Sequence, residues 1–467
     1  MPRLLVALIS LHALLWALIP TFLHTAPPLD MVELVSLADT GTIANYKHPN
    51  LPGLILDALR VLGVGMVGLY WVSQLCVAAT LFIVYRLSRS FVSDSAAAVA
   101  SALLLGVYYF TLPTPELNHN VLQMPLWAAV IALAWWAVRD GRLGQWVALA
   151  ICAGALLWTK YSAGLLLLAV GMWFLIDAQA RSRLRTYGPW LVVLLSGAIA
   201  LPQGLYLIQS DFLPLEYAQI RAQNAQDGPA VFLLTQLANH IPLALIAAAA
   251  GLWGSGAWTA RARDRRTVFL FAMFAGPLAL ICLVGLLGSG GLRSMWGAPM
   301  FSLSGLVVVY FFGGRLNHHR ERRAQGFALA LTSVLAILYA TQLLVRDYVK
   351  EKPSRVLWPQ AQIAAAVADR AGSAVPPTIV GPYWEAGLVA MQPDYWRQVF
   401  IDADPLKSPH VADFSHGYAV VWRGSPSPSL SAFIQQEGLD PADALRVMIP
   451  WSERQPPIEL KLLLSSP

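Results

Sequence analysis

The sequence contains few charged residues. Of its 467 residues only 12% are Asp, Glu, Lys or Arg, whereas soluble globular proteins contain about 25%. Hydrophobic residues make up 57% of the chain, and its mean hydropathy is +0.56. This composition excludes a soluble globular protein, and we predict an integral membrane protein.

Cysteine is also scarce. The chain has three, Cys76, Cys152 and Cys282, each inside an apolar run and at a spacing that matches no metal site. We therefore expect neither a disulfide framework nor a cysteine-bound zinc ion, and we interpret all three as packing residues.

What the sequence does contain is a series of long apolar runs. A run of about 20 apolar residues crosses a hydrocarbon core as a helix, because lipid satisfies no backbone polar group outside a helix or a closed barrel. The first run lacks a small-residue cleavage site, so we interpret it as a retained span rather than a secretory signal. Eleven spans are predicted, at 4–23, 66–85, 95–112, 121–138, 143–159, 161–177, 187–209, 230–251, 268–288, 298–313 and 326–345.

Basic residues gather in alternate loops between these runs. Such a distribution marks the cytoplasmic side of a membrane protein, so the net charge of +6 predicts orientation and no nucleic-acid partner. We expect a multi-pass membrane protein with a cytoplasmic N-terminus. The basic groups are Arg86 with Arg89, Arg139 with Arg142, Arg181 to Arg185, Arg261 to Arg266, and Arg315 to Arg323.

The composition changes after Tyr348. The remaining residues contain prolines, charges and short alternating runs such as TIVGPYW and YAVVWRG, separated by turn signals. We predict a membrane domain at 1–347 and a small extracytoplasmic α/β domain at 348–467, with a helix over Ser354 to Arg370. We find no inverted repeat, which argues against a transporter.

A few ionisable residues depart from this charge pattern, because they fall on the predicted outer side. Ionisable groups near lipid are costly unless they are paired or functional, so they suggest a site at the membrane surface. Snorkelling or interfacial ion pairing is the alternative for each of them. The cations are Lys47, Arg60, Lys160, Arg221 and Arg293, and the acids are Asp30, Glu33, Asp39, Asp57, Glu116, Asp211 and Glu216.

A lipid-linked phosphate would suit such a site. Its tail would lie in the bilayer, and several cations would hold its anionic head through charge-assisted hydrogen bonds. If the phosphate is the leaving group of a glycosyl donor, those cations also stabilise charge that develops in the transition state. Asp30 or Glu33, in the first outer loop, is the candidate base for an acceptor hydroxyl.

The residues that suggest this site also resemble a known family. Asp30-x-x-Glu33 followed by Tyr46-Lys47-His48-Pro49 resembles the first outer loop of bacterial GT-C glycosyltransferases. The match is to the branch of the protein O-mannosyltransferases, the lipid A aminoarabinose transferases and the rhizobial lipopolysaccharide galacturonosyltransferases (glycosyltransferase families 39 and 83). Further matching pieces are ELNHNVLQMPLW at 116–127, LLWTKYSAGLLLL at 156–168, DFLPLEYAQIR at 211–221 and RSMWGAPM at 293–300.

The resemblance implies an all-α polytopic GT-C fold, with juxtamembrane helices in the first outer loop, and inverting transfer of a sugar from a polyprenyl-monophosphate donor. It implies Asp30 as the base and His48 at the donor phosphate. Three positions depart from the family pattern. Glu33 is spaced from Asp30 where relatives have the two acids adjacent, Asn50 replaces a second proline, and Asn120 replaces a second aspartate.

The remaining candidates surround these residues. Asp30 could instead be an N-cap and Glu33 part of a capping box, which would give both acids a structural role. A metal site at His119 is a further alternative, although the two flanking asparagine amides are poor zinc ligands. Arg221 follows Tyr217 by one helical turn, so the two side chains can pair. We expect Lys47, His48, Lys160, Arg221 and Arg293 at the donor phosphate, and Tyr46, Asn118, His119, Asn120, Tyr161, Tyr217 and Trp296 at the substrates.

The predicted partners are a polyprenyl-phosphate sugar, membrane lipid, and a glycan, lipid or protein acceptor of the cell envelope. We expect a monomer without a cofactor, and a divalent metal stays an open alternative. Two other functions also stay open at this point. One is transport of a lipid carrier or solute, and the other is non-catalytic binding of a lipid-linked sugar.

Overall fold

The computed structural model describes residues 1–37, 42–252, 264–288, 290–313, 316–350, 354–371, 376–391, 396–408 and 414–465. Asp39 and parts of two predicted basic groups, 261–263 and 315, lie outside the described residues. Internal contacts divide the chain into two compact units. The first comprises Met1–Ala17, Lys47–Pro49 and Trp71–Ile337, and the second Leu18–Tyr46, Asn50–Tyr70 and Leu338–Pro467. These units are not consecutive in sequence, and the domain boundary at 347/348 stays a prediction.

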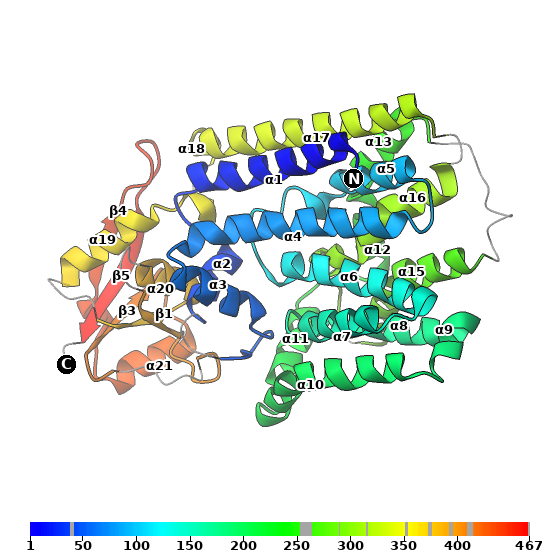
Figure 1. Ribbon diagram of the computed structural model, residues 1–467. Coiled ribbons are helices and arrows are strands. Elements are labelled where there is room, and N and C mark those ends of the chain that lie inside the picture. The colour runs from blue at the N-terminus through cyan, green and yellow to red at the C-terminus, as the bar shows by residue number, and fades with distance from the viewer. Residues whose placement is uncertain are drawn as a thin grey trace. The chain divides into compact units, whose positions relative to one another are not determined.

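The first unit consists of apolar helices (Figure 1). Eight segments are long and apolar enough to cross a membrane: α1 (Arg3–Leu23), α4 (Gly65–Ser88), α6 (His119–Asp140), α10 (Tyr187–Gln209), α12 (Pro229–Ala238) with α13 (Ile241–Ala249), α15 (Arg265–Leu287), η3 (Ser294–Leu303) with α16 (Ser304–Phe312), and α17 (His318–Leu344). Shorter apolar segments are α5 (Asp94–Leu103) with η1 (Leu104–Gly106), α7 (Leu143–Leu157) and α8 (Ala163–Ile176). Each predicted span overlaps one of these segments, so the helical membrane fold is confirmed, and the number of crossings stays a prediction.

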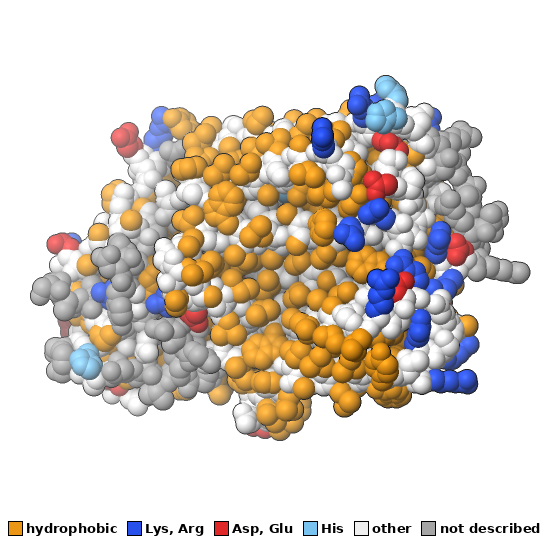
Figure 2. Space-filling model, in the orientation of Figure 1, with side chains coloured by type: hydrophobic (Ala, Val, Ile, Leu, Met, Phe, Trp, Pro, Cys, Tyr) orange, Lys and Arg blue, Asp and Glu red, His pale blue; other side chains and the backbone are white. Residues whose placement is uncertain are grey.

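Hydrophobic side chains cover the visible face of these helices (Figure 2). On α10, for example, Leu194 is 73% exposed and Val193 61% exposed, which in water would form an unusually apolar patch. Lys and Arg side chains gather at one end of the helices, near α9 (Ala178–Arg183) and the turn between α6 and α7. An apolar band bounded by charge is the surface that a bilayer requires.

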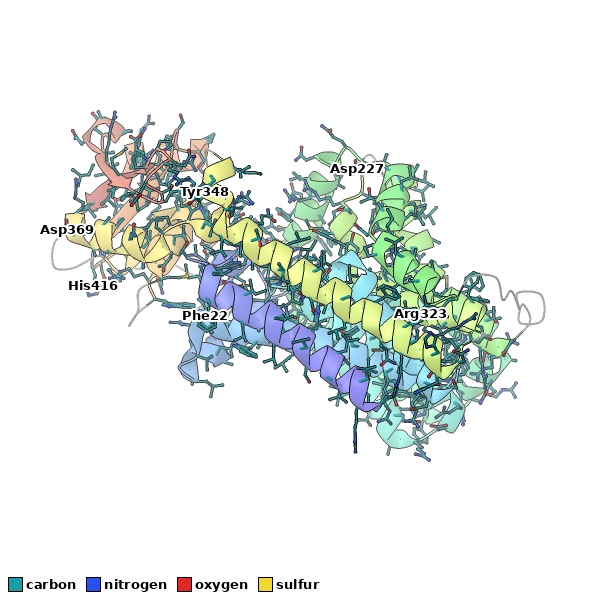
Figure 3. All side chains as sticks on the ribbon, turned by 90° about the horizontal axis from the view of Figure 1, so that it is seen from above. Phe22, Asp227, Arg323, Tyr348, Asp369 and His416 are labelled. Carbon is teal, nitrogen blue, oxygen red and sulfur yellow. The ribbon has the colours of Figure 1, made fainter. Side chains whose placement is uncertain are left out.

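Two helices far apart in sequence lie side by side. Figure 3 shows α1 alongside α17, whose labelled Arg323 lies near one end. The buried His12 Nδ1 lies 2.7 Å from Thr332 Oγ1, and Trp16 Nε1 donates to the same hydroxyl at 3.4 Å. These bonds satisfy polar groups inside an apolar span and fix the register of α1 on α17.

A polar network holds the break between α12 and α13. Tyr109, in η2 (Tyr108–Phe110), accepts from Asn239 Nδ2 at 3.1 Å, and its hydroxyl lies 2.9 Å from Gln236 Oε1. Gln236 Nε2 in turn donates to the carbonyl of Ser294 at 3.1 Å. Because Ser294 begins η3, this network fixes the start of the segment that follows Arg293.

The second unit includes the last residues of α1 and the segment that follows this helix. His24 Nδ1 lies 3.0 Å from the Tyr70 hydroxyl of α4, and Nε2 lies 2.7 Å from the Tyr339 hydroxyl of α17. Burial lowers the pKa of His24 to about 4, so the ring is neutral at physiological pH. Two short helices follow in the first outer loop, α2 (Leu29–Val35) and α3 (Leu51–Val61).

The C-terminal part of this unit is a five-stranded mixed sheet. Its strands are β1 (Thr378–Gly381), β2 (Gln398–Ile401), β3 (Tyr418–Trp422), β4 (Leu445–Ile449) and β5 (Ile458–Ser465), in the order β2-β1-β3-β5-β4. β1 is parallel to β2 and β3, with Ile379 opposite Val399 and Ala419, and β5 is antiparallel to β3 and β4. The predicted α/β architecture of the C-terminal region is confirmed.

Successive side chains along each strand point to opposite faces of the sheet, so buried strand residues pack on both faces. Val380, Val420 and Trp422 pack with Leu430 and Ile434 of α21 (Pro428–Gln436). Helix α20 (Tyr383–Ala390) also packs against β1, β2 and β3. The helix predicted over Ser354 to Arg370 is instead a short η5 (Arg355–Leu357) followed by α19 (Gln360–Ala371), because Pro359 disfavours a helical conformation at Trp358.

Helix α20 also packs against α2. A Cβ atom at Gly387 would lie 2.6 Å from Val32 Cγ1 and 3.3 Å from the Val32 carbonyl oxygen. The absence of a side chain at Gly387 therefore permits this close approach. Since α2 carries Asp30 and Glu33, the C-terminal sheet region supports the helix that bears both candidate bases.

We expect Gly387→Ala to lower the apparent melting temperature of the purified protein, because the new methyl group overlaps Val32. Overpacking of this kind typically costs about 1–3 kcal/mol. Val32→Ala should restore much of the loss when it is combined with Gly387→Ala.

The matched control is Gly326→Ala in α17, where a Cβ meets no atom within 4 Å. That variant should be unchanged or slightly more stable, because alanine favours a helix. If Gly387→Ala melts like wild type, the α2–α20 contact is not close.

Candidate functional site

The tip of the first outer loop carries Lys47 and His48. At the base of this loop the Asn50 amide donates to the Ile43 carbonyl at 2.9 Å, and Asn50 Nδ2 donates to the Thr42 carbonyl at 2.9 Å. Asn50, the residue that departs from the family pattern, thus closes the loop. The tip, Lys47–Pro49, belongs to the first unit.

The tip is held by the start of α6. His119 Nε2 lies 3.2 Å from the carbonyl oxygen of Pro49, and the His48 and His119 rings are 4.5 Å apart between centroids. The ring of Tyr217, from α11 (Leu213–Gln223), stands edge-on to His48 at 6.4 Å. Lys47 Nζ lies 5.5 Å from the centroid of the same tyrosine ring. Loop, α6 and α11 therefore meet at His48.

Lys160 comes from the turn between α7 and α8. Its Nζ donates a hydrogen bond to Asn120 Oδ1 at 2.9 Å. Asn118 Oδ1 caps α6 by accepting from the amides of Asn120 and Val121. The asparagine that replaces the family's second aspartate thus orients a lysine.

Arg221 and Arg293 complete the set of cations. The Arg221 guanidinium carbon lies 6.0 Å from the centroid of the Tyr217 ring, which confirms the predicted pairing. Arg293 Nε donates to the Arg221 carbonyl at 3.4 Å. A Cβ at Gly290 or Gly291 would lie 2.5 Å from backbone atoms of Ala222 or Ala225, so these glycines permit close backbone approach. Among the described residues, neither arginine forms an ion pair with a carboxylate.

The electrostatics of His48 follow from this crowding. Burial lowers the pKa of His48 well below its usual value, and the charges of His119, Lys160, Lys47 and Arg221 lower it further. His48 is therefore neutral at pH 7. A neutral imidazole can donate a hydrogen bond to an anion without adding to the repulsion among the neighbouring cations.

The candidate bases lie in the second unit. Asp30 and Glu33, both partly exposed, are on α2, and Tyr46 precedes the loop tip. The N-cap of α2 is Pro28, without a side-chain cap bond, and Asp30 lies in the first turn. The interpretations of Asp30 as an N-cap and of Glu33 as a capping box are therefore wrong. A carboxylate in the first turn is still favourable, because the helix dipole is positive there.

Two other predicted substrate residues have identifiable surroundings. The buried Tyr161 hydroxyl has no hydrogen-bond partner among the described residues, and burial raises its pKa. Trp296, in η3, packs against the helical core, which gives it a structural role.

Gln123, one turn beyond Asn120 on α6, is fully buried, and neither polar atom of its side chain has a partner in the described part of the chain. Sequence analysis missed Gln123, although its spacing from Asn120 places both on one helix face.

The described residues contain no group of three or more His, Cys, Asp or Glu side chains that could hold a metal ion. The site instead combines Lys47, Lys160, Arg221 and Arg293 with two imidazoles and a tyrosine. Such a donor set suits a compact anion with several oxygen atoms, above all a phosphate. All of these residues belong to the first unit, so their grouping is a property of that unit.

Part of the chain matches a known family. Residues 47–206 match the family described as dolichyl-phosphate-mannose-protein mannosyltransferase. The match contains His48, Asn120 and Lys160. No curated protein sequence matches the chain significantly.

Solved structures resemble the fold over nearly its full length. ArnT from Cupriavidus metallidurans bound to undecaprenyl phosphate is similar with a TM-score of 0.66 at 13% identity, and the match covers 98% of this chain and 97% of ArnT. Apo ArnT gives 0.65 with the same identity and coverage. The oligosaccharyltransferase of Archaeoglobus fulgidus, in complex with zinc and sulfate, gives 0.44 at 12% identity, covering 84% of this chain and 62% of that one.

We predict that His48 stays neutral down to pH 6, because its pKa lies well below 6.5. Lys160→Gln should raise the pKa of His48 by removing one positive neighbour, while burial keeps it below 6.5. Histidine-labelled protein, titrated by NMR with His48→Gln used for assignment, measures both values. A His48 that is half protonated at pH 6.5 would contradict this electrostatic description.

Proposed function

We propose that this chain, a membrane protein with the fold of the GT-C glycosyltransferases, transfers a sugar from a polyprenyl-monophosphate donor to an acceptor of the cell envelope. The observation that carries the proposal is the grouping of Lys47, Lys160 and Arg221 around His48. Several cations close together repel one another, so an arrangement of this kind is favourable when an anion binds among them.

The charge balance of the reaction fits these cations. In the donor, one phosphate joins the lipid and the sugar, and it carries about one negative charge. Transfer breaks the bond between the anomeric carbon and phosphate oxygen and forms a bond to the acceptor oxygen, so polyprenyl phosphate leaves with about one additional negative charge. Cations that surround the phosphate stabilise this developing charge.

The donor class is supported by similarity at the level of fold and family. ArnT, which shares the fold, has been solved with undecaprenyl phosphate bound, and the matched family is described by a dolichyl-phosphate donor. Both molecules are isoprenoid monophosphates, whose single phosphate suits a compact set of cations. We therefore assign Lys47, His48, Lys160, Arg221 and Arg293 to the donor phosphate.

The acceptor hydroxyl needs a base, and Asp30 is our assignment. It lies partly exposed in the first turn of α2. During inverting transfer the hydroxyl proton would pass to Asp30 as the acceptor oxygen attacks the anomeric carbon. Glu33, one turn further along α2, would be the alternative base. We place the reaction at the periplasmic face of the bacterial inner membrane.

We expect Lys160→Gln and Arg221→Gln each to weaken binding of undecaprenyl phosphate at least tenfold, because each loses a charge-assisted contact. Equilibrium binding to purified protein in detergent measures the effect. Arg142→Gln is the matched control, since Arg142 is an exposed arginine of a predicted cytoplasmic loop, and its affinity should equal that of wild type. Unchanged affinity in both site variants would refute the phosphate assignment.

Asp30→Asn should reduce the transfer rate roughly 10²- to 10⁴-fold with little change in donor binding, because an asparagine accepts no proton. Turnover of a radiolabelled polyprenyl-phosphate sugar, with envelope lipids as acceptors, measures the rate. Asp57→Asn is the control, since Asp57 lies on the neighbouring α3 and pairs with Arg60 at 3.6 Å.

Normal turnover by Asp30→Asn together with loss of turnover in Glu33→Gln would identify Glu33 as the base. A wild-type protein that binds the donor but neither transfers nor hydrolyses it would instead be a non-catalytic binder of a lipid-linked sugar. Mass comparison of envelope lipids and glycans from cells with and without the gene would identify the acceptor.

A further inference from the structure

The C-terminal sheet changes winding direction beside its first strand. The chain leaves β1 through α20 to reach β2 on one side, and it then returns to β3 on the other side of β1. The connections that follow β1 and β3 therefore diverge at the carboxyl edge of the parallel strands. In open α/β sheets such a point forms a crevice in which ligands bind.

Two tryptophans and two arginines gather at this edge. Trp384, in α20 directly after β1, stands edge-on to Trp358 with ring centroids 5.6 Å apart. The guanidinium of Arg423, the first residue after β3, lies 5.4 Å from the Trp358 ring centroid, and that of Arg355 lies 5.9 Å from the Trp384 ring centroid. Stacking on an indole orients a guanidinium and leaves its N–H groups available.

In the described part of the chain, both arginine side chains lack a polar partner. Among the described residues, neither the Arg355 nor the Arg423 side chain forms a hydrogen bond or an ion pair with a carboxylate. The indole nitrogen of Trp384, which is only 7% exposed, also has no partner in the described part of the chain. The edge thus presents two oriented cations beside a buried donor with an unsatisfied N–H group.

Acids and strained backbone lie beside these groups. The pKa of Glu385 is raised by burial, while the charges of Arg423 and Arg355 act to lower it and that of Asp402 to raise it. Asp402, directly after β2, has a φ of 52°, Ala403 has a φ of 54°, and Lys407 Nζ contacts the Asp402 carboxylate at 2.7 Å. A left-handed conformation at two successive non-glycine residues stores strain, which is characteristic of functional sites.

We propose that this carboxyl edge is a second binding site, in which Arg355 and Arg423 hold the phosphate or carboxylate of an anionic sugar. Arginine pairs favour such oxyanions because their forked N–H groups match two oxygen atoms at once. The Trp384 indole N–H and the carboxyl groups of Glu385 and Asp402 supply a donor and acceptors for sugar hydroxyls. No residue of the donor-phosphate assignment contributes to this site.

The same segments support α2. The Val356 carbonyl, next to Arg355, accepts hydrogen bonds from the amides of Thr25 and Ala26 at 2.9 and 3.2 Å, just before α2 begins. Gly387, two residues after Glu385, contacts Val32 of α2. The anionic-sugar site and Asp30 are therefore connected through short contacts within one unit. This step rests on the proposed function: the second site would hold the anionic acceptor whose hydroxyl Asp30 deprotonates.

Binding is tested directly, without any need for transfer activity. Full-length protein labelled with 5-fluorotryptophan is titrated with glucose 1-phosphate, glucuronic acid and neutral glucose, and fluorine NMR follows Trp358 and Trp384, assigned with Trp358→Phe and Trp384→Phe. We expect both anionic sugars to shift these two signals, with glucose at least tenfold weaker. Arg355→Gln combined with Arg423→Gln should weaken the anionic sugars at least tenfold.

Arg446→Gln is the matched control, because Arg446 is an exposed arginine on β4 of the same sheet and lies 3.6 Å from Glu459. Its titration should equal that of wild type, and thermal unfolding verifies that all variants are folded. Absence of a shift in wild type, a shift that survives the double variant, or an equal response to glucose would overturn the proposal. Inorganic phosphate that binds as tightly as glucose 1-phosphate would overturn the sugar specificity.

A second experiment distinguishes failure of the anionic-sugar site from failure of the proposed transferase function. In the transfer assay, the double variant should raise the KM for an anionic acceptor at least tenfold and leave undecaprenyl phosphate binding unchanged. Lack of transfer by wild type would count against the proposed function, whereas the fluorine titration would still decide the sugar site. Equal loss of donor and acceptor binding in the double variant would overturn a separate acceptor site.

Discussion

Crowding of cations around His48 is the constraint on which the proposed site of the membrane unit depends. Lys47, Lys160 and Arg221 surround His48, and their charges together with burial keep this histidine neutral. The protein tolerates the crowding by placing Asn120 on Lys160 and Tyr217 beside Lys47 and Arg221, neither of which neutralises a charge. Under our proposal, the anion that binds among these cations is the phosphate of an isoprenoid donor.

The first outer loop contributes residues to both units. Its tip carries Lys47 and His48 and belongs to the helices, whereas its two short helices belong with the C-terminal sheet. Helix α2 is supported by α20 through the Val32–Gly387 contact and by η5 through the Val356 carbonyl. An acid on α2 is thus positioned by the C-terminal region, and this gives the region a role in acceptor chemistry under our proposal.

Several features followed from local sequence. The length of the apolar runs predicted the helices, because a lipid-exposed backbone must satisfy its own hydrogen bonds. Alternation of apolar and polar residues predicted the strands of the C-terminal sheet. The pairing of Tyr217 with Arg221 followed from one-turn spacing. Features that depend on proline or on distant partners did not follow: Pro28 displaced Asp30 from the N-cap, and Pro359 split the predicted helix at Trp358. The Asn120–Lys160 bond joins residues 40 positions apart, which no local pattern encodes.

The sequence by itself determined a helical membrane protein with a small α/β region, and it identified the cations that we assign to the donor phosphate. It did so because composition and periodicity act over a few residues. Only the tertiary structure decided that the loop tip meets α6, the α7–α8 turn and α11, and that Arg355 and Arg423 converge beside Trp358 and Trp384. These arrangements depend on strand order and helix packing, which are set by contacts between residues distant in the chain.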